Sequence, residues 1–269
     1  MSYLSRIVIP PLRRLRLPVL QVLARLARAR SIPPGSKVII CPHPDDESFG
    51  TGGLIAAARR QSSASSDPRA QVNILFLTSG DASHQGCCNI SRQKLSAERE
   101  ATARRVAAIL GVAQTNLHFM RLADGSIPHT ASPCFAEVSA RLAALLAAFK
   151  PEQVFIPHPL DGWPDHVAVM ELTRQALRLA QCRPALYHYS TWFWIKMPFR
   201  ATLKIDWRRG VVVDISSVYE VKRSAIRTYL EDLAPCGRPY CGNLPSPFLR
   251  AFESKMELFF PVTAETQPA

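Results

Sequence analysis

The sequence has no apolar run that approaches the roughly 20 residues needed to cross a bilayer, so no transmembrane helix is expected. Its seven cysteines are odd in number and irregular in spacing, which argues against a disulfide framework and fits a reducing, cytoplasmic compartment. Cys236 and Cys241 could supply half of a metal site, but no second pair stands at the spacing of a structural zinc site. We therefore interpret both as thiols in a loop.

Acidic residues are absent from the first 44 positions, which hold eight basic residues. This stretch accounts for most of the net charge of +12, and the remaining residues together carry only +4. The high overall charge is therefore weak evidence for nucleic-acid binding, and we expect no nucleic-acid partner. The length of 269 residues, of which 47% are hydrophobic, suits one large α/β domain, or one domain with a tail.

Residues 1–33 combine arginines with prolines and with an apolar stripe. The pattern is typical of an amphipathic helix that lies on an anionic membrane surface, here the inner face of a membrane. It fits equally well a helix packed on its own domain, and an organelle transit peptide is a further alternative. A secretory signal fits less well, because arginines keep recurring. The stripe consists of Val19, Leu20, Val22, Leu23, Leu26 and Ala27.

From residue 37 onward, β-branched runs alternate with helical patterns. This succession predicts a Rossmann-like α/β fold with a mainly parallel sheet, helices on both faces, and an active site at the C-terminal ends of the strands. We expect a basic amphipathic segment at 1–36, one domain at 37–262 and a flexible tail at 263–269. A polar loop is expected at Ser62–Asp67. The expected strands are Val38–Cys41, Val72–Thr78, Leu117–Arg121, Gln153–Pro157, Ala185–Trp192 and Val211–Ile215, and the expected helices are Gly50–Arg60, Ser91–Leu110, Phe135–Phe149, Asp165–Ala180 and Val218–Leu230.

A histidine and two carboxylates follow the first of these strands. His43 stands between two prolines, Asp45 and Asp46 come next, and a Gly-rich turn follows. Two adjacent carboxylates repel each other unless a positive charge lies between them or one holds a proton. A metal ion that uses one as a ligand and leaves the other as a base accounts for the group. The alternative is that both carboxylates cap the following helix.

A second histidine and carboxylate group follows the strand at 153–157. It contains His158, Asp161, Asp165 and His166. Parallel strands place their C-terminal ends at one edge of the sheet, so this loop can face the first one across a crevice. Two imidazoles and a carboxylate from the two loops would complete a catalytic zinc site with one open position.

These motifs resemble the zinc-dependent N-acetylglucosaminyl deacetylases of the PIG-L or LmbE-like family. The resemblance covers about residues 37–260 and rests mainly on His43-Pro44-Asp45-Asp46-Glu47 with Pro164-Asp165-His166. Weaker agreements are Thr78-Ser79-Gly80-Asp81, Arg99 with Leu110-Gly111-Val112, Asp124-Gly125, and Lys222 with Ala225 and Tyr229.

The resemblance implies a role for each matching position. It makes His43, Asp46 and His166 the zinc ligands and Asp45 the base that activates the attacking water. It makes Asp165 an orienting partner of a neighbouring imidazole. It also implies that Arg99, Asp81 and Asp124 contact the substrate. We expect His158 and Trp163 to be substrate-binding residues as well.

Two positions depart from the family pattern. Trp163 stands where many members carry a histidine thought to stabilise the oxyanion, so the oxyanion could rest mainly on zinc. His158, upstream on the same loop, could substitute for that histidine or support the loop. Thr102 stands where the helix pattern expects a carboxylate, which puts the surroundings of Arg99 in question.

The resemblance implies hydrolysis of the N-acetyl group of an N-acetylhexosamine, with Zn²⁺ or another divalent metal as the cofactor. The aromatic run Tyr187–Trp194 could stack on sugar rings or apolar substrate parts, especially at Trp192–Trp194. Together with the basic N-terminus, it favours a lipid-linked or phosphorylated sugar. The alternatives are a metal-dependent phosphoesterase and a non-catalytic sugar-binding protein of the same fold.

Overall fold

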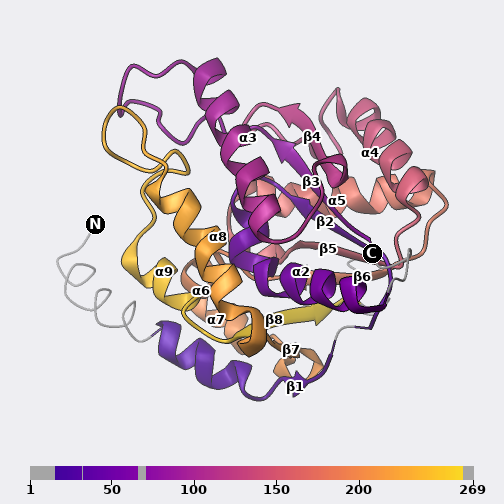
Figure 1. Ribbon diagram of the computed structural model, residues 1–269. Coiled ribbons are helices and arrows are strands. Elements are labelled where there is room, and N and C mark those ends of the chain that lie inside the picture. The colour runs from indigo at the N-terminus through magenta and orange to yellow at the C-terminus, as the bar shows by residue number, and fades with distance from the viewer. Residues whose placement is uncertain (1–15, 32, 66–70, 263–269) are drawn as a thin grey trace.

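An eight-stranded sheet forms the centre of the computed structural model, which describes residues 16–31, 33–65 and 71–262 (Figure 1). The strand order is β1-β7-β8-β6-β5-β2-β3-β4. The strands are β1 (Arg28–Ala29), β2 (Lys37–Cys41), β3 (Val72–Thr78), β4 (Leu117–Leu122), β5 (Gln153–Pro157), β6 (Ala185–Tyr189), β7 (Val211–Asp214) and β8 (Met256–Pro261). The helices are α2 (Asp46–Ser65), α3 (Arg92–Ile109), α4 (Phe135–Phe149), α5 (Pro164–Leu179), α6 (Phe193–Lys196), α7 (Phe199–Thr202), α8 (Tyr219–Glu231) and α9 (Ser246–Ala251).

The prediction of a mainly parallel sheet is confirmed. β2 pairs in parallel with both β3 and β5, so Lys37 lies opposite Val72 on one side and Gln153 on the other. β8 runs antiparallel between β6 and β7 and had not been predicted from the sequence. Because β2 and β5 are parallel neighbours, the loops that follow them emerge at the same edge of the sheet.

Helices cover both faces of the sheet, as predicted. Ile39 and Cys41 of β2 belong to the core shared with α2, α3 and α8, which lie in front of the sheet in Figure 1. Val38 and Ile40 belong to the core shared with α4 and α5. Successive side chains of a strand point to opposite faces, so a strand that is apolar throughout must be covered on both sides.

The helix after β2 is longer than predicted. α2 starts at Asp46 rather than Gly50 and continues to Ser65, so it includes both the expected Gly-rich turn and part of the expected polar loop. The glycines of this stretch do not form a turn but let neighbouring side chains pack closely against α2. A Cβ atom at Gly50 would lie 2.4 Å from Cδ2 of Tyr189, and one at Gly53 would lie 2.5 Å from Cγ2 of Ile215.

A buried ion pair holds the first half of α2. Glu257 of β8 accepts hydrogen bonds from the backbone N–H groups of Gly53 and Leu54, both at 2.8 Å. Lys222 of α8 donates to the Phe49 carbonyl at 2.9 Å and to Glu257 at 2.6 Å. Removing one partner of such a buried pair would leave an uncompensated charge, which typically costs about 3–5 kcal/mol. The C-terminal part of the chain therefore fixes the helix that begins at Asp46.

The N-terminal segment joins the fold where the structure describes it. Residues 16–24 are helical, Leu20 is buried in the core with Phe248, and β1 pairs with β7. Val22 and Leu26 of the apolar stripe remain 58% and 53% exposed. The stripe thus packs partly on its own domain, and its contact with a membrane stays a prediction. Residues 1–15 and the expected tail at 263–269 lie outside the described residues.

Within the described ranges 16–31, 33–65 and 71–262, no helix is both long enough and apolar enough to span a bilayer.

Candidate metal centre

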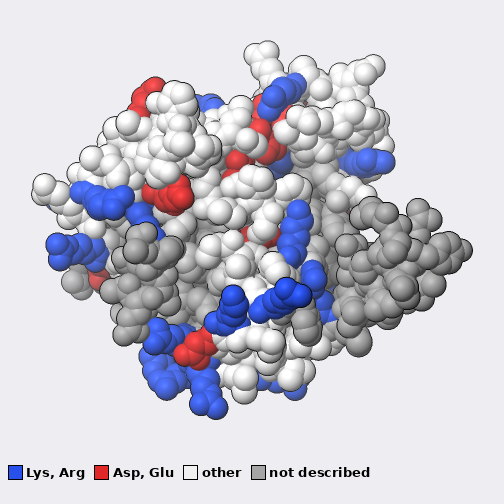
Figure 2. All heavy atoms as spheres, turned by 180° about the vertical axis from the view of Figure 1, so that it is seen from behind, with Lys and Arg blue, Asp and Glu red and all other residues white. Residues whose placement is uncertain are grey.

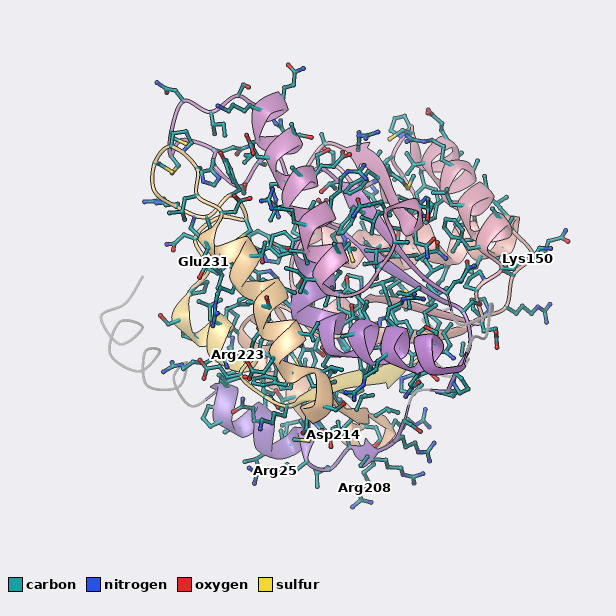
Figure 3. All side chains as sticks on the ribbon, viewed as in Figure 1. Arg25, Lys150, Arg208, Asp214, Arg223 and Glu231 are labelled. Carbon is teal, nitrogen blue, oxygen red and sulfur yellow. The ribbon has the colours of Figure 1, made fainter. Side chains whose placement is uncertain are left out.

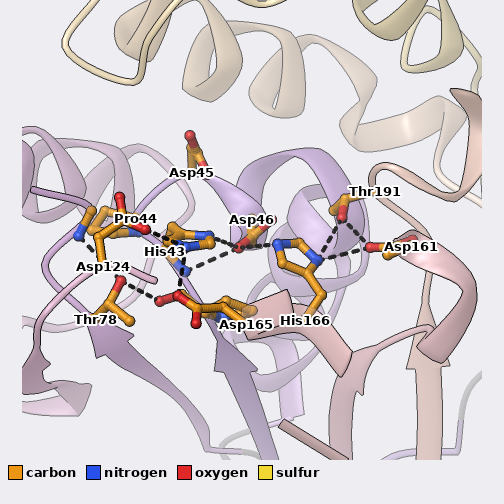
Figure 4. A network of polar contacts seen from close by, with 12 residues as sticks. His43, Pro44, Asp45, Asp46, Thr78, Asp124, Asp161, Asp165, His166 and Thr191 are labelled. Carbon is orange, nitrogen blue, oxygen red and sulfur yellow. Dashed lines mark hydrogen bonds and ion pairs between the residues drawn. The ribbon is translucent and has the colours of Figure 1, made fainter. Parts of the chain in front are cut away.

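The structure brings the two histidine and carboxylate groups together at the C-terminal ends of β2 and β5 (Figure 4). His43 lies in the loop after β2, Asp46 begins α2, and His166 lies in the first turn of α5. Nδ1 of His43 is 3.4 Å from Oδ2 of Asp46, and Nε2 of His166 is 3.5 Å from the same oxygen. One ligand atom from each residue lies within 4.8 Å of the others.

His166 provides the clearest indication that this group fits a metal ion. Its side chain is fully buried, and within the described part of the chain its Nε2 makes no hydrogen bond. Its Nδ1 lies 2.9 Å from Oδ2 of Asp161. A proton held on Nδ1 by the carboxylate leaves the Nε2 lone pair directed toward Asp46 and His43. Two imidazoles and one carboxylate form a donor set that suits Zn²⁺ with an open position.

Asp161 is a functional residue to which the sequence analysis gave no role. It is fully buried and accepts hydrogen bonds from the Thr191 hydroxyl and, at 2.7 Å, from the Phe193 backbone N–H. These partners come from the chain after β6, and together they fix the carboxylate against His166. A carboxylate five residues before a histidine at a strand end was the available signal in the sequence.

We expect the Asp161→Asn variant to bind zinc about 10- to 100-fold more weakly, the usual cost of losing a partner that orients a metal-binding histidine. An amide cannot stabilise the proton on Nδ1 of His166 as a carboxylate does. Competition with a chromogenic chelator measures the change. Asp206→Asn, at an exposed position remote from the site, is the control. Equal zinc affinity in the two variants would contradict the assigned role.

The far side of His43 contacts two further carboxylates. Its Nε2 lies 3.1 Å from Oδ1 of Asp124 and 3.3 Å from Oδ2 of Asp165. Burial acts to lower the pKa of His43, but hydrogen bonds to Asp124, Asp165 and Asp46 outweigh it and raise the pKa well above its ordinary value. Burial raises the pKa of Asp124, but its contact with His43 prevails and lowers it to about 2. Asp165 therefore lies where the orienting role was expected.

His43, Asp124 and Asp165 also form a group that could hold a cation. The two carboxylates, however, already accept backbone hydrogen bonds. Asp124 accepts from Ala82 at 3.1 Å, and Asp165 accepts from Gly125 at 2.8 Å and from Ile127 at 3.1 Å. The Nε2 atom of His166, which makes no hydrogen bond within the described residues, belongs to the group with His43 and Asp46. That group is therefore the better metal site.

Asp45 projects into the same site on an unusual backbone. Its φ angle is +137°, a conformation that L-residues rarely adopt, and such strain is often found at functional positions. Its N–H donates to Oε2 of Glu47 at 3.0 Å, and its Oδ2 lies 3.0 Å from Nη2 of Arg99. Burial raises the pKa of Asp45 well above its usual value, with Arg99 acting in the opposite direction. Glu47 is held in turn by the Tyr229 hydroxyl at 2.8 Å.

Arg99 is buried and is directed mainly at the protein itself. It donates to the Gly80 carbonyl at 2.9 Å and to the Pro44 carbonyl, in addition to its ion pair with Asp45. A Cβ atom at Gly80 would lie 2.4 Å from the guanidinium carbon, so a larger residue there would displace Arg99. Arg99 also lines the pocket, and its contact with substrate stays a prediction. At Thr102, where a carboxylate was expected, the hydroxyl donates to Asp232, which supplies the carboxylate from another loop.

Asp81 and His158 lie away from the pocket lining. Asp81 accepts hydrogen bonds from the Asp124 backbone at 2.9 Å and from Arg92 at 2.8 Å, so it supports the loop that carries Asp124. His158 accepts from the Leu160 N–H at 3.1 Å, and burial together with the charge of His188 lowers its pKa well below normal. Of the two roles considered for His158, this geometry favours support of its own loop.

A pocket of about 430 Å³ opens in front of the metal centre, within the size range of small-molecule sites. Its polar end holds His43, Asp45 and Asp46, and its apolar wall includes Trp163, Trp192 and Phe248. The Trp192 ring lies 4.4 Å from Phe248 and 5.5 Å from Trp163, measured between ring centroids. The Nζ atom of Lys196 lies 3.3 Å from the Trp163 centroid. The position of the missing histidine thus carries an aromatic ring in contact with a cation.

The aromatic run contributes less to the pocket than predicted. β6 ends at Tyr189 rather than Trp192, and Trp192 alone of the three residues Trp192–Trp194 lines this pocket. Phe193 and Trp194 begin α6, and both side chains are buried in the core.

Comparisons of the sequence with known proteins agree on one family. A family model described as PIG-L, GlcNAc-PI de-N-acetylase, matches residues 38–177. The diacetylchitobiose deacetylase of Thermococcus kodakarensis is 28% identical over 222 residues, covering 76% of this chain and 74% of that protein.

Solved structures agree on the fold. The N,N'-diacetylchitobiose deacetylase of Pyrococcus horikoshii matches with a TM-score of 0.56 and 20% identity, over 81% of this chain and 74% of that one. GalB of Pseudomonas putida KT2440, a 4-carboxy-2-hydroxymuconate hydratase, matches with a TM-score of 0.56 and 22% identity, over 72% and 78%. Since a hydratase shares the architecture with a deacetylase, the fold alone does not define the reaction.

Proposed function

The chain belongs to the PIG-L family, and on that premise we propose that it removes the acetyl group from an N-acetylglucosamine unit of a larger glycoconjugate. It is a deacetylase, an amide hydrolase of an N-acetyl sugar. The proposal for the site rests on one observation above all. His43, Asp46 and His166 lie close enough together to bind one metal ion. Two of them, His43 and Asp46, line the same pocket as a separate carboxylate, Asp45.

The residues divide the chemistry among them. A zinc ion held by His43, Asp46 and His166 would supply Lewis acidity toward the acetyl carbonyl and lower the pKa of the attacking water. Asp45 takes the proton from that water and then passes it to the departing amine. Its burial raises its pKa, which makes it a stronger base toward the attacking water. Arg99 and Glu47 hold Asp45 in place.

The pocket wall supports a substrate larger than a free sugar. Trp163, Trp192 and Phe248 offer aromatic faces beside the polar end of the pocket, and sugars and apolar groups both stack on such faces. The family is described by a GlcNAc unit joined to PI, which agrees with a conjugated substrate.

A basic edge of the molecule supports presentation of that substrate at an anionic membrane. One depression is lined by Arg28, Arg30, Arg208 and Arg209, together with Asp206. Basic side chains gather at the lower left of the molecule in Figure 2. Arg25 and Arg208 project from the same lower edge in Figure 3. Val22 and Leu26 are exposed on the neighbouring segment. Exposed apolar and basic side chains together favour binding to anionic lipid.

Acetate release tests the proposed function. The zinc-loaded protein is given free N-acetylglucosamine, diacetylchitobiose, and GlcNAc-phosphatidylinositol in vesicles with and without anionic lipid. We expect acetate from the conjugates at a higher kcat/KM than from the monosaccharide, and a further gain on anionic vesicles. Faster turnover of the monosaccharide would overturn the proposed substrate class. Phosphate release without acetate would favour a phosphoesterase, and binding without turnover would favour a sugar-binding protein.

A further inference from the structure

Two loops outside the metal centre lie side by side in the upper left of Figure 1. One loop, residues 79–91, connects β3 with α3, and the other, residues 232–245, connects α8 with α9. The Ser83 hydroxyl of the first loop donates to the Tyr240 carbonyl of the second at 2.8 Å. The two loops bring Cys236, which the sequence analysis had interpreted as a loop thiol, close to Cys87 and Cys88.

Four residues with soft or imidazole donors converge between these loops. His84, Cys87 and Cys88 come from the first loop and Cys236 from the second, and one donor atom from each lies within 4.8 Å of the others. The Sγ atoms of Cys87 and Cys236 are 3.2 Å apart. This separation exceeds the ~2.05 Å of a disulfide bond and is nearer the ~3.8 Å expected for two thiolates on one tetrahedral zinc ion. Cys241, in contrast, is buried and faces the Tyr229 carbonyl.

His84 provides a second, independent observation. Its side chain is buried, with 4% of the residue exposed, and its Nε2 has no hydrogen-bond partner among the described residues. Its Nδ1 lies 3.2 Å from the Ser83 hydroxyl, which leaves Nε2 as the available donor to a metal. A buried imidazole nitrogen without a partner is costly, and a disulfide between two of the cysteines would not satisfy it.

We propose that His84, Cys87, Cys88 and Cys236 bind a structural zinc ion, separate from the one in the catalytic pocket. Three thiolates and one imidazole form a closed tetrahedral set, which is typical of structural rather than catalytic zinc.

The proposed ion would hold one side of the catalytic pocket in shape. Ser83 and Gln85 of the first loop and Gly242 and Leu244 of the second all line that pocket. Short loops without a hydrophobic core of their own need such a crosslink to stay in register. A link between positions that are far apart in the chain also removes much of the entropy of the unfolded state.

Metal content and zinc X-ray absorption test the proposal on the full-length chain. We expect about two zinc ions per chain, with sulfur neighbours at about 2.3 Å in the absorption spectrum. His166→Ala should retain about one ion and a spectrum richer in sulfur, because the catalytic ion is lost. Cys236→Ser should retain about one ion and lose the sulfur signal. Cys134→Ser, which removes an exposed cysteine outside the group, should retain both ions.

Three results would overturn the proposal. The first is a wild-type spectrum without sulfur neighbours, a measurement that does not depend on any variant folding. The second is an intact mass, measured without reductant under inert gas, about 2 Da lower because Cys87 and Cys236 have lost two hydrogens to a disulfide. The third is unchanged zinc content in Cys236→Ser. None of these readouts uses acetate release. The second zinc site can therefore be confirmed even if the proposed deacetylase function fails, and it can be rejected even if that function is confirmed.

Discussion

Replacing His166 by alanine is expected to remove the catalytic metal and to lower kcat/KM by about 1000-fold or more. The imidazole contributes one of the three donors, and its Nε2 has no other hydrogen-bond partner in the described part of the chain. A metal that polarises a carbonyl and activates water is worth several kcal/mol, and about 4 kcal/mol corresponds to about three powers of ten in rate. His43→Ala should behave in the same way.

Acetate release and zinc content are measured together on the same preparations. Circular dichroism and the melting temperature establish that the variant is folded. His129→Ala, which removes an exposed histidine that is not part of the metal-binding group, should retain both metal and rate. A folded His166→Ala protein with normal turnover would remove the basis of the proposed mechanism, because the remaining donors would then suffice.

Asp45→Asn is expected to retain the catalytic zinc and to lose about 100- to 10,000-fold in kcat, the usual contribution of a general base. Asparagine has the shape of aspartate and can keep the contact with Arg99, but it cannot accept the proton of the attacking water. Because the metal ligands are unchanged, zinc content separates this effect from loss of the site. The pair of variants thus distinguishes metal binding from proton transfer.

Single-turnover acetate release, with substrate saturating, gives the chemical step directly. Asp214→Asn is the matched control, since Asp214 is exposed at the end of β7 and remote from the pocket. Near-normal turnover by Asp45→Asn would contradict the role of this carboxylate, and Glu47 would then be the next base to test. Glu47 is buried beside Asp45, and burial raises its pKa to about 7.

The strands that could be predicted well are those whose own residues form a clear apolar run. β2, β3 and β5 are short runs of buried apolar residues bounded by polar turns, and each was expected within one residue of its observed bounds. The antiparallel β8 was missed because its residues come after a stretch without a clear periodic pattern. Its place in the sheet depends on pairing with β6 and β7, which a local pattern does not record.

The same contrast holds for the candidate site, where residues in short motifs were predicted and residues that depend on distant partners were not. His43, Asp46 and His166 stand in short motifs and were expected to meet because parallel strands end at one edge. Asp161 orients His166 from five residues away, but its significance depends on the partners that follow β6. The cluster around Cys236 lies at no recognisable spacing, because three donors come from one loop and the fourth from a loop about 150 positions later. Such groupings exist only after folding.

The bond between Glu257 and the amides of α2 has a consequence for biosynthesis. All three metal-binding residues lie within the first two thirds of the polypeptide, but the helix that carries Asp46 depends on a carboxylate near the other end. Until β8 has been translated, those amides lack their acceptor and the Lys222 ammonium lacks its carboxylate partner. Loading of the metal should therefore be a late event, completed only once Glu257 has been synthesised and has paired with α2.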